Sequence, residues 1–409
     1  MSASASLASH QSPIGYPEER FPLFPPLDLG APAAPGRPVW PAELIFDYDR
    51  VPHRDLRPEV FDMLLPPRNA ALALGEGNTP LFDCGFLARK TGLASRILVK
   101  DEAANPTGSH KDRYAYFAIC AAAASAAPGV VLSSSGNHGA AVAAYAARAG
   151  VPCVIFGLPQ TPSPIVRQCL EYGANFFYAH FERRWELVRA VHAKYGWAVL
   201  STVTEPPSGH PFGIEGYKAV AFELLAALRK APDAVVMPTG YGELLFGVWK
   251  GFVEARRLNW CRSIPKLFAV EPESRSPHRM ALNENVDWAI DPRPAISAMP
   301  SIDTRICGPR GMLALRSSGG SVLVVNDEET RVMQQELSCS GISCELSSAA
   351  AFAALRRYAD LLMGFQTIVV INTARRWKEY SDIAPDVKTV SELGDISLFH
   401  RSPGAHDSA

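Results

Sequence analysis

Apolar and polar positions follow two different patterns over most of the chain. From residue 75 onward, short runs rich in Val, Ile and Leu alternate with longer Ala-, Leu- and Arg-rich stretches whose apolar positions recur at helical spacing. The short runs predict strands at residues 96–100, 130–133, 153–156, 175–178, 198–201, 234–237, 267–270, 321–325 and 366–371. The longer stretches predict helices at residues 111–127, 139–149, 164–172, 184–195, 213–229, 244–257, 327–339 and 348–362.

Most of the predicted strands are apolar throughout and are followed by a helix. Such strands are typical of parallel sheets that are covered by helices on both faces. The pattern therefore predicts an α/β fold. Because nine strands would make an unusually large open sheet, we divide them between two mostly parallel sheets, each flanked by helices and each belonging to its own domain.

The two ends of the chain lack these patterns. The first 41 residues contain nine of the 34 prolines, which excludes a regular helix or a central strand there. We expect an irregular arm that wraps a surface or stays loose. Residues 42–74 are mixed, with a short helix expected near residues 57–65 that ends at Pro66-Pro67. Residues 394–409 are polar and are expected to form a loose tail.

Composition and charge exclude several classes of protein. A chain of 409 residues predicts two or three domains, and 47% hydrophobic residues exclude disorder for most of it. A formal net charge of −1 removes the electrostatic reason to expect nucleic acid or an acidic membrane as the main partner. Residues 114–147 carry no Asp, Glu, Lys or Arg, but a Pro-Gly pair and a Ser-rich turn interrupt them, which predicts a buried helix, strand and helix rather than a membrane span.

The eight cysteines are scattered and form no CxxC pair, so we expect reduced thiols and no metal site. The first residues lack a basic segment followed by an apolar one, so we expect no secretory leader and a cytoplasmic protein. The chain contains neither HExxH nor GxSxG, which disfavours metal and serine hydrolases.

The first segment with candidate chemistry is NPTGSHKDR, residues 105–113. It delivers Lys111 to the first turn of an apolar helix, where the positive end of the helix dipole disfavours a cation. Burial also lowers the pKa of a lysine, and a neutral amine can form a Schiff base. A surface lysine that pairs with Asp112 explains the same residues equally well.

Two further segments lie between a predicted strand and a predicted helix. SSSGNHG, residues 133–139, combines hydroxyls, glycines and free N–H groups, which suits a carboxylate but is also typical of a capped helix start. PTGYGEL, residues 238–244, has two glycines that let backbone N–H groups approach a phosphate. Glu243 is unusual in an anion site, and a tight turn of this kind needs no ligand. The segment matches neither GxxxxGK[ST] nor GxGxxG.

Taken together with GEGNTPL at residues 75–81 and KDE at residues 100–102, these motifs resemble the pyridoxal-phosphate enzymes of the tryptophan synthase β-subunit fold, also called fold type II. Within that group the sequence is most similar to threonine synthase. The resemblance covers residues 72–380 in the family's motif order. CELSSAA at residues 344–350 resembles the family's CEPASAA segment; its Glu345 would support the ring pocket or act only as a helix-start carboxylate.

The resemblance implies a role for each motif. Lys111 would hold pyridoxal phosphate through a Schiff base and later move the Cα proton of the substrate. Asn137 would hydrogen-bond the cofactor's phenolic oxygen, and Thr373 would face its pyridine nitrogen, where a hydroxyl favours expulsion of a leaving group over a long-lived carbanion. The substrate carboxylate would be held by a turn comprising Ser134, Ser135, Gly136, Asn137 and His138. The cofactor phosphate would be held by a loop comprising Gly240, Tyr241, Gly242, Glu243 and Leu244.

The resemblance also implies the domain organisation. Residues 1–74 would form the arm and lead-in, residues 75–112 and 203–393 a large cofactor-binding domain, residues 113–202 an inserted small domain, and residues 394–409 the tail. Residues 201–216 resemble the family's return from the small to the large domain. Relatives of this fold are often dimers, so a homodimer is expected.

Several positions depart from threonine synthase. His110 replaces the usual Phe and is similar to the tryptophan synthase β-subunit, and SSGNHG is spelled as in serine and threonine dehydratases. The segment after Thr373 reads ARRW instead of a glycine-rich run. Residues 201–213 lack the Asn…His-Arg pattern associated with a phosphorylated substrate; His210 is the only candidate cation there, and Arg375 or Arg376 would have to supply the charge from elsewhere.

The leading function is a threonine synthase-like elimination and replacement on an amino acid, with γ-elimination and β-addition of water on an O-phosphohomoserine-like substrate. The alternatives are ammonia elimination of the serine/threonine dehydratase type and β-replacement of the cysteine synthase type. A different class is a catalytically inactive relative that binds a ligand or partner, which the complete GSHKDR and GN motifs disfavour.

Overall fold

A computed structural model describes residues 6–53, 55–134, 136–294 and 296–379. Its larger sheet has six strands in the order β11-β10-β9-β12-β4-β3. All neighbours are parallel except β3, which pairs antiparallel with β4. The strands are β3 (Leu81–Asp83), β4 (Arg96–Asp101), β9 (Ala234–Pro238), β10 (Lys266–Pro272), β11 (Ser321–Val325) and β12 (Thr367–Asn372).

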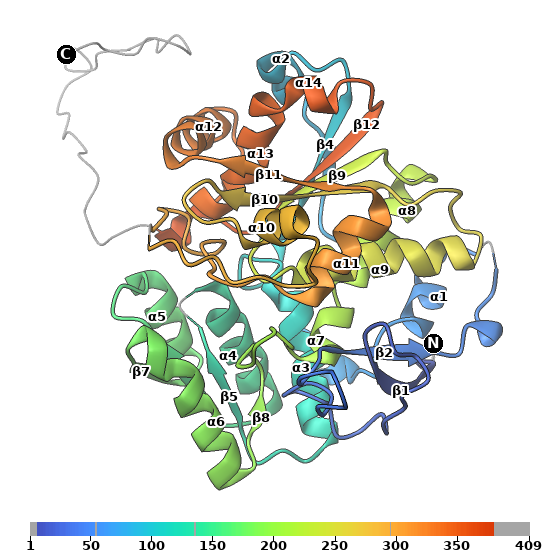
Figure 1. Ribbon diagram of the computed structural model, residues 1–409. Coiled ribbons are helices and arrows are strands. Elements are labelled where there is room, and N and C mark those ends of the chain that lie inside the picture. The colour runs from blue at the N-terminus through green and yellow to red at the C-terminus, as the bar shows by residue number, and fades with distance from the viewer. Residues whose placement is uncertain (1–5, 54, 135, 295, 380–409) are drawn as a thin grey trace, which may run out of the picture.

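The residues between β4 and β9 contain a second sheet of four parallel strands in the order β7-β6-β5-β8 (Figure 1). Its strands are β5 (Val130–Ser133), β6 (Cys153–Gly157), β7 (Asn175–Tyr178) and β8 (Ala198–Val199). All nine strands predicted from the apolar runs are therefore present, divided between two mostly parallel sheets as expected. The exact domain boundaries stay a prediction.

Helices cover both sheets. α13 contacts β9, β10, β11 and β12 on one face of the larger sheet, while α9 and α11 contact β10. Around the smaller sheet, α4 and α6 both contact β5 and β6. These elements confirm the predicted α/β fold. The helices are α1 (Pro58–Met63), α2 (Gly85–Thr91), α3 (Lys111–Ala124), α4 (Asn137–Ala149), α5 (Ser163–Glu171), α6 (Arg184–Tyr195), α7 (Pro211–Glu215), α8 (Lys218–Leu228), α9 (Glu243–Arg257), α10 (Pro277–Glu284), α11 (Pro309–Ser318), α12 (Asp327–Cys339), α13 (Leu346–Arg357) and α14 (Ala359–Leu362).

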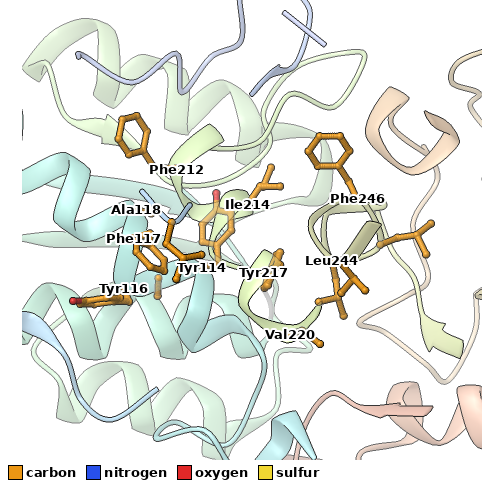
Figure 2. Packing of buried hydrophobic residues seen from close by; sticks show 14 of the residues in the cluster. Tyr114, Tyr116, Phe117, Ala118, Phe212, Ile214, Tyr217, Val220, Leu244 and Phe246 are labelled. Atoms are coloured by element: carbon orange, nitrogen blue, oxygen red, sulfur yellow. The ribbon is translucent and has the colours of Figure 1, made fainter. Parts of the chain in front are cut away.

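One apolar core runs through both sheets. It contains Val130 and Ile155 from the smaller sheet and Val235 and Leu267 from the larger one. Figure 2 shows part of this core, where Tyr114 of α3 lies beside Ile214 and Tyr217. The larger sheet has a separate apolar cluster on its other face, formed with α12 and α13. The shared core fixes the two sheets against each other, so residues carried by different sheets can form one site.

Two predicted helices are each divided. The helix expected at residues 213–229 is α7 followed by α8, with Gly216 and Tyr217 between them. A Cβ on Gly216 would lie 2.5 Å from the carbonyl oxygen of Arg113, so the chain turns there in close contact with α3. The helix expected at residues 348–362 is interrupted at Tyr358, whose hydroxyl bonds to the backbone of Val324 in β11.

The proline-rich arm is packed rather than loose. Its strand β1 (Ala8–Pro13) pairs antiparallel with β2 (Ala42–Phe46), which directly follows the arm and contacts α7. The side chains of Leu7 and Ile14 in the arm are buried in the main core. The first alternative for the arm, that it wraps a surface, is therefore the correct one. α1 occupies the short helix expected before Pro66.

The uncharged run at residues 114–147 forms α3, β5 and α4, as predicted. Nowhere in the described part of the chain is a helix both long and apolar enough to traverse a membrane. All eight cysteines are free thiols. The expected tail at residues 394–409 and the side chain of Ser135 lie outside the described residues.

Candidate active site

Lys111 is the first residue of α3 and points toward the start of α9. Its Nζ lies 3.9 Å from Oε2 of Glu243 and 5.8 Å from the centre of the Tyr217 ring. Burial lowers the pKa of Lys111, and the charges of Glu243 and Glu345 only partly oppose this shift. Lys111 is thus a partly desolvated amine with one carboxylate nearby.

The alternative of a surface lysine paired with Asp112 is wrong. The Asp112 carboxylate instead accepts hydrogen bonds from the backbone N–H of Thr107 at 3.1 Å and from its hydroxyl at 3.0 Å. These bonds hold the loop that precedes α3, in which Gly108 has a φ of +83°. The loop and the helix therefore turn Asp112 and Lys111 in different directions.

Asn137 starts α4 and reaches across to the larger sheet. Its Nδ2 donates a hydrogen bond to Oε2 of Glu345 at 2.7 Å, while its Oδ1 is buried with no partner among the described residues. Burial raises the pKa of Glu345, against the hydrogen bond from Asn137 and the charge of Lys378. Glu345 makes no side-chain cap for α13. Glu345 is therefore both the N-cap residue of α13 and in contact with the site, and its role in the ring pocket stays a prediction.

The turn before α4 is held largely by its own hydrogen bonds. The Ser134 hydroxyl accepts from the N–H groups of Gly136 at 3.3 Å and Gly139 at 2.9 Å. His138 Nε2 contacts the Leu200 carbonyl, and its buried Nδ1 has no partner in the described chain. Burial lowers the pKa of His138 to about 3, with a smaller contribution from Lys111, so this imidazole is neutral. The turn is both a helix start and one wall of the site.

The loop at residues 240–244 leads from β9 into α9. Gly242 has a φ of +92°, and a Cβ on it would lie 2.6 Å from Gly311 Cα and 2.9 Å from His278 Nε2, so only glycine fits. No side chain caps α9, and the first of its N–H groups with a partner among the described residues is that of Phe246, which donates to the Gly242 carbonyl. Unpaired N–H groups at the start of a long helix suit a phosphate.

The side chains of this loop face different surroundings. Leu244 is buried in the main core, and burial raises the pKa of Tyr241 to about 12. Gly240 keeps the loop close to the backbone of Ser301, whose carbonyl would lie 3.3 Å from an added Cβ. Glu243 alone extends its functional group toward Lys111; its Oε1 accepts a hydrogen bond from the Thr202 hydroxyl at 3.1 Å.

Thr373 follows β12 and is buried against the loop that carries Lys111. Its N–H donates to the Ser348 hydroxyl at 2.9 Å, and its carbonyl accepts from the N–H of His110 at 2.9 Å. His110 Nδ1 lies 3.2 Å from the same carbonyl, and burial keeps the pKa of His110 well below its ordinary value. Thr373 is therefore held beside the loop that precedes Lys111, and its role toward the ring nitrogen stays a prediction.

The three candidate cations named from the sequence supply no charge to the site. Arg375 donates to the Ala103 carbonyl at 3.0 Å and pairs with Asp101 at 3.3 Å, and Arg376 donates to the Ser338 hydroxyl at 2.8 Å. Burial lowers the pKa of His210 to about 3, so this side chain is neutral.

Sequence reasoning missed Arg310, a buried cation near Glu243. It follows Pro309 at the start of α11, and its guanidinium donates to the carbonyl of Ala42 in β2. Burial lowers the pKa of Arg310 to about 10, with the charge of Glu243 as the main opposing influence. A single Arg in a helix start gives no signal in the sequence, because its partners come from the arm and from α9.

Several buried polar atoms on the elements that carry the site have no partner within the described ranges. They include Asn137 Oδ1, His138 Nδ1, His210 Nε2 and Tyr217 Oη. The rings of the last three residues lie 4.8, 6.4 and 6.1 Å from the Tyr114 ring. Buried polar groups are normally hydrogen-bonded, so this group of unpaired atoms fits a polar ligand between the two sheets.

The chain is similar in sequence and in fold to known proteins. The family model described as pyridoxal-phosphate dependent enzyme matches residues 72–374. Threonine synthase of Methanosarcina acetivorans is 31% identical over 82% of this chain and 85% of its own, and that of Halalkalibacterium halodurans is 32% identical over 70% and 78%. The solved structure of maize serine racemase has a TM-score of 0.64 at 23% identity, covering 73% of this chain and 88% of its own.

Proposed function

Because the chain belongs to the family of pyridoxal-phosphate dependent enzymes, we propose that it catalyses a threonine synthase-like elimination and replacement on the side chain of an amino acid. The family match and the relatives confirm the predicted cofactor, pyridoxal phosphate, the predicted fold of the family and the predicted class of enzyme. The observation that carries the proposal is the position of Lys111: a desolvated amine between unpaired polar atoms and the uncapped start of α9.

The residues present fit the cofactor. Lys111 would bind it covalently, and the N–H groups at the start of α9 would hold its phosphate. Asn137 Nδ2 makes one hydrogen bond, to Glu345, so its second N–H would donate to the phenolic oxygen of the cofactor. Thr373 would lie beside the ring nitrogen. When bound, pyridoxal phosphate withdraws electrons from the substrate Cα, which makes the Cα proton acidic.

Lys111 would then move that proton. A lowered pKa leaves more of its amine in the neutral form near neutral pH, where it can accept a proton at Nζ and return it. The N–H groups and hydroxyl of the turn from Ser134 to His138 would hold the substrate carboxylate. The neutral imidazole of His138 offers hydrogen bonding without a competing charge.

Two reactions remain as candidates. The relatives named threonine synthase favour γ-elimination and β-addition of water on an O-phosphohomoserine-like substrate. A specific observation favours the second candidate, ammonia elimination from a hydroxy amino acid: Arg375 and Arg376 bond elsewhere and His210 is neutral. These side chains therefore give no charge to a substrate phosphate.

Product analysis separates the candidates. The purified holoenzyme is incubated with O-phosphohomoserine, with threonine or serine, and with O-acetylserine plus sulfide. Release of phosphate together with threonine indicates the first candidate, a 2-oxo acid with ammonia the second, and a thiol adduct the β-replacement alternative. Lys111→Ala is the control and is expected to abolish every reaction. Turnover that survives this substitution contradicts the assignment of Lys111.

We further propose that the enzyme acts as a homodimer in the cytoplasm. The support is the resemblance to a fold whose members are often dimers, together with the thiols, all of which are free. Light scattering of the purified holoenzyme gives its molecular mass directly, and a mass equal to one chain contradicts the dimer.

A further inference from the structure

Glu243 is a carboxylate for which the proposed chemistry so far has no use. It is the first residue of α9, in the loop whose N–H groups suit a phosphate. Its Oε2 lies 3.9 Å from Lys111 Nζ, and its Oε1 accepts the hydrogen bond from Thr202 at 3.1 Å. One carboxylate therefore connects the reactive amine with the segment that returns from the smaller sheet.

The surroundings hold this carboxylate in place. Gly209 has a φ of +60°, and a Cβ on it would lie 2.5 Å from Glu243 Oε1 and 2.8 Å from Ile214 Cδ1. Only a glycine lets the backbone close over the carboxylate at this point. With the Thr202 hydroxyl on one oxygen and Gly209 packed beside it, the side chain is fixed in its orientation toward Lys111.

Other charged and titratable groups also act on Lys111, but each is occupied or neutral. Glu345 is bonded to Asn137, and His138 is kept neutral by burial. In the described part of the chain, Glu243 is the residue that forms an ion pair with Lys111. The groups that face Lys111 from neighbouring elements are Glu243 of α9, Glu345 before α13, His110 before α3, His138 of α4 and Tyr217 between α7 and α8.

We propose that Glu243 is a positioning residue that holds the Lys111 nitrogen and stabilises its protonated form. The proton that leaves the substrate Cα is taken up at Nζ and is later returned from Nζ, while the Glu243 carboxylate 3.9 Å away keeps its contact with that nitrogen. The inference rests on the proposed function, since it requires that Lys111 carries the cofactor.

The test is a pH titration of the visible absorbance of the cofactor in the holoenzyme, compared between wild type and Glu243→Gln. A carboxylate within about 4 Å favours the cationic form of a nitrogen, so its neutralisation is expected to lower the apparent pKa by about one to three units. Glu328→Gln is the matched control. Glu328 also lies in the first turn of a helix, but it is exposed on α12, and its substitution is expected to leave the titration unchanged.

Thr202→Val is the second variant, because it removes the hydroxyl that holds Glu243 without removing the charge. A smaller shift in the same direction is expected. A titration of Glu243→Gln that superimposes on wild type overturns the inference. Borohydride reduction followed by peptide mass analysis is run in parallel. If no cofactor is attached at Lys111, the proposed function fails; if it is attached and the titration is unchanged, only the role of Glu243 fails.

Discussion

Two lysines, the buried Lys250 of α9 and the partly buried Lys111 that faces the start of α9, differ in their partners. The ammonium of Lys250 contacts Glu43 at 2.8 Å, the carboxylate of Glu215, and the Leu44 carbonyl at 2.7 Å. These contacts raise the pKa of Lys250 despite its burial. Lys111 has one carboxylate at 3.9 Å, and its pKa is lowered. The same type of side chain is thus kept charged at one place and pushed toward neutrality at the other.

The difference shows that the partners of a lysine side chain decide whether it serves structure or catalysis. A buried cation with a full set of partners is bound firmly and serves structure, because removal of one partner leaves an uncompensated charge. Lys250 joins β2 and α7 to α9 in this way. A partly buried amine with too few partners is a better base and nucleophile. The same substitution at both positions should therefore have opposite consequences.

Lys111→Met is expected to have the largest effect on activity. The loss of the amine should lower turnover about 10³-fold or more, because both cofactor attachment and proton transfer depend on it. Stability should change little, since a poorly compensated charge is replaced by an apolar chain of similar length. Steady-state kinetics, visible absorbance and urea unfolding of the apoenzyme measure these effects. Marked unfolding of this variant would mean that Lys111 is a structural residue.

Lys250→Met is expected to do the reverse. It removes the cation that Glu43 and Glu215 share, although Glu215 keeps its ion pair with Lys218 at 2.8 Å. The loss of unfolding free energy should therefore lie at the lower end of the about 3–5 kcal/mol that breaking a buried pair costs. Activity per folded molecule should stay close to wild type at low temperature. Urea unfolding monitored by circular dichroism gives the stability, and titration of bound cofactor gives the folded fraction. If Lys250→Met were as stable as wild type but inactive, the two lysines would not differ in role.

The sequence predicted the elements around Lys111 well, because local patterns determine them. The nine apolar runs all form strands, and α3 begins at Lys111 as the motif required. The short strand β3 and helix α2 were missed, since neither is long enough for its periodicity to stand out. The strands β1 and β2 lie in a proline-rich segment whose composition hides them.

Which side chains meet could not be predicted, because the contacts join distant parts of the chain. The Asn137–Glu345 hydrogen bond spans 208 positions, and Lys250 donates to Leu44 of β2, 206 positions away. Motifs identified the residue types at the site, but they left open whether Arg375 or Arg376 supplies charge there; both bond to other parts of the chain. Arg310, near Glu243, carried no signal at all.

Asp112 and Lys378 are two further buried ionisable groups near Lys111 that have few compensating partners. Their effect on the free energy of unfolding is the smallest of those predicted. Burial raises the pKa of Asp112 to about 7 from an ordinary value of 3.8, against the hydrogen bonds from Thr107 and the charge of Lys378. Lys378 is itself fully buried, and its Nζ has no hydrogen-bond partner among the described residues. Because the folded state holds the Asp112 proton more tightly than the unfolded state, unfolding free energy falls as pH rises from about 4 to 7.

Asp112→Asn should remove this part of the pH dependence. Each unit of pKa shift corresponds to about 1.4 kcal/mol, so between pH 5 and 7 the wild type should lose about 2 kcal/mol more than the variant. Urea unfolding of both proteins at the two pH values measures the difference, and Glu379, whose pKa is also raised to about 7, contributes equally to both and cancels. If the variant loses this pH dependence, the buried charges next to Lys111 are also poorly compensated, and the low pKa of Lys111 is a property of the whole region. Parallel pH profiles for the two proteins would restrict the poor compensation to Lys111 itself and would make Asp112 an ordinary loop-holding carboxylate.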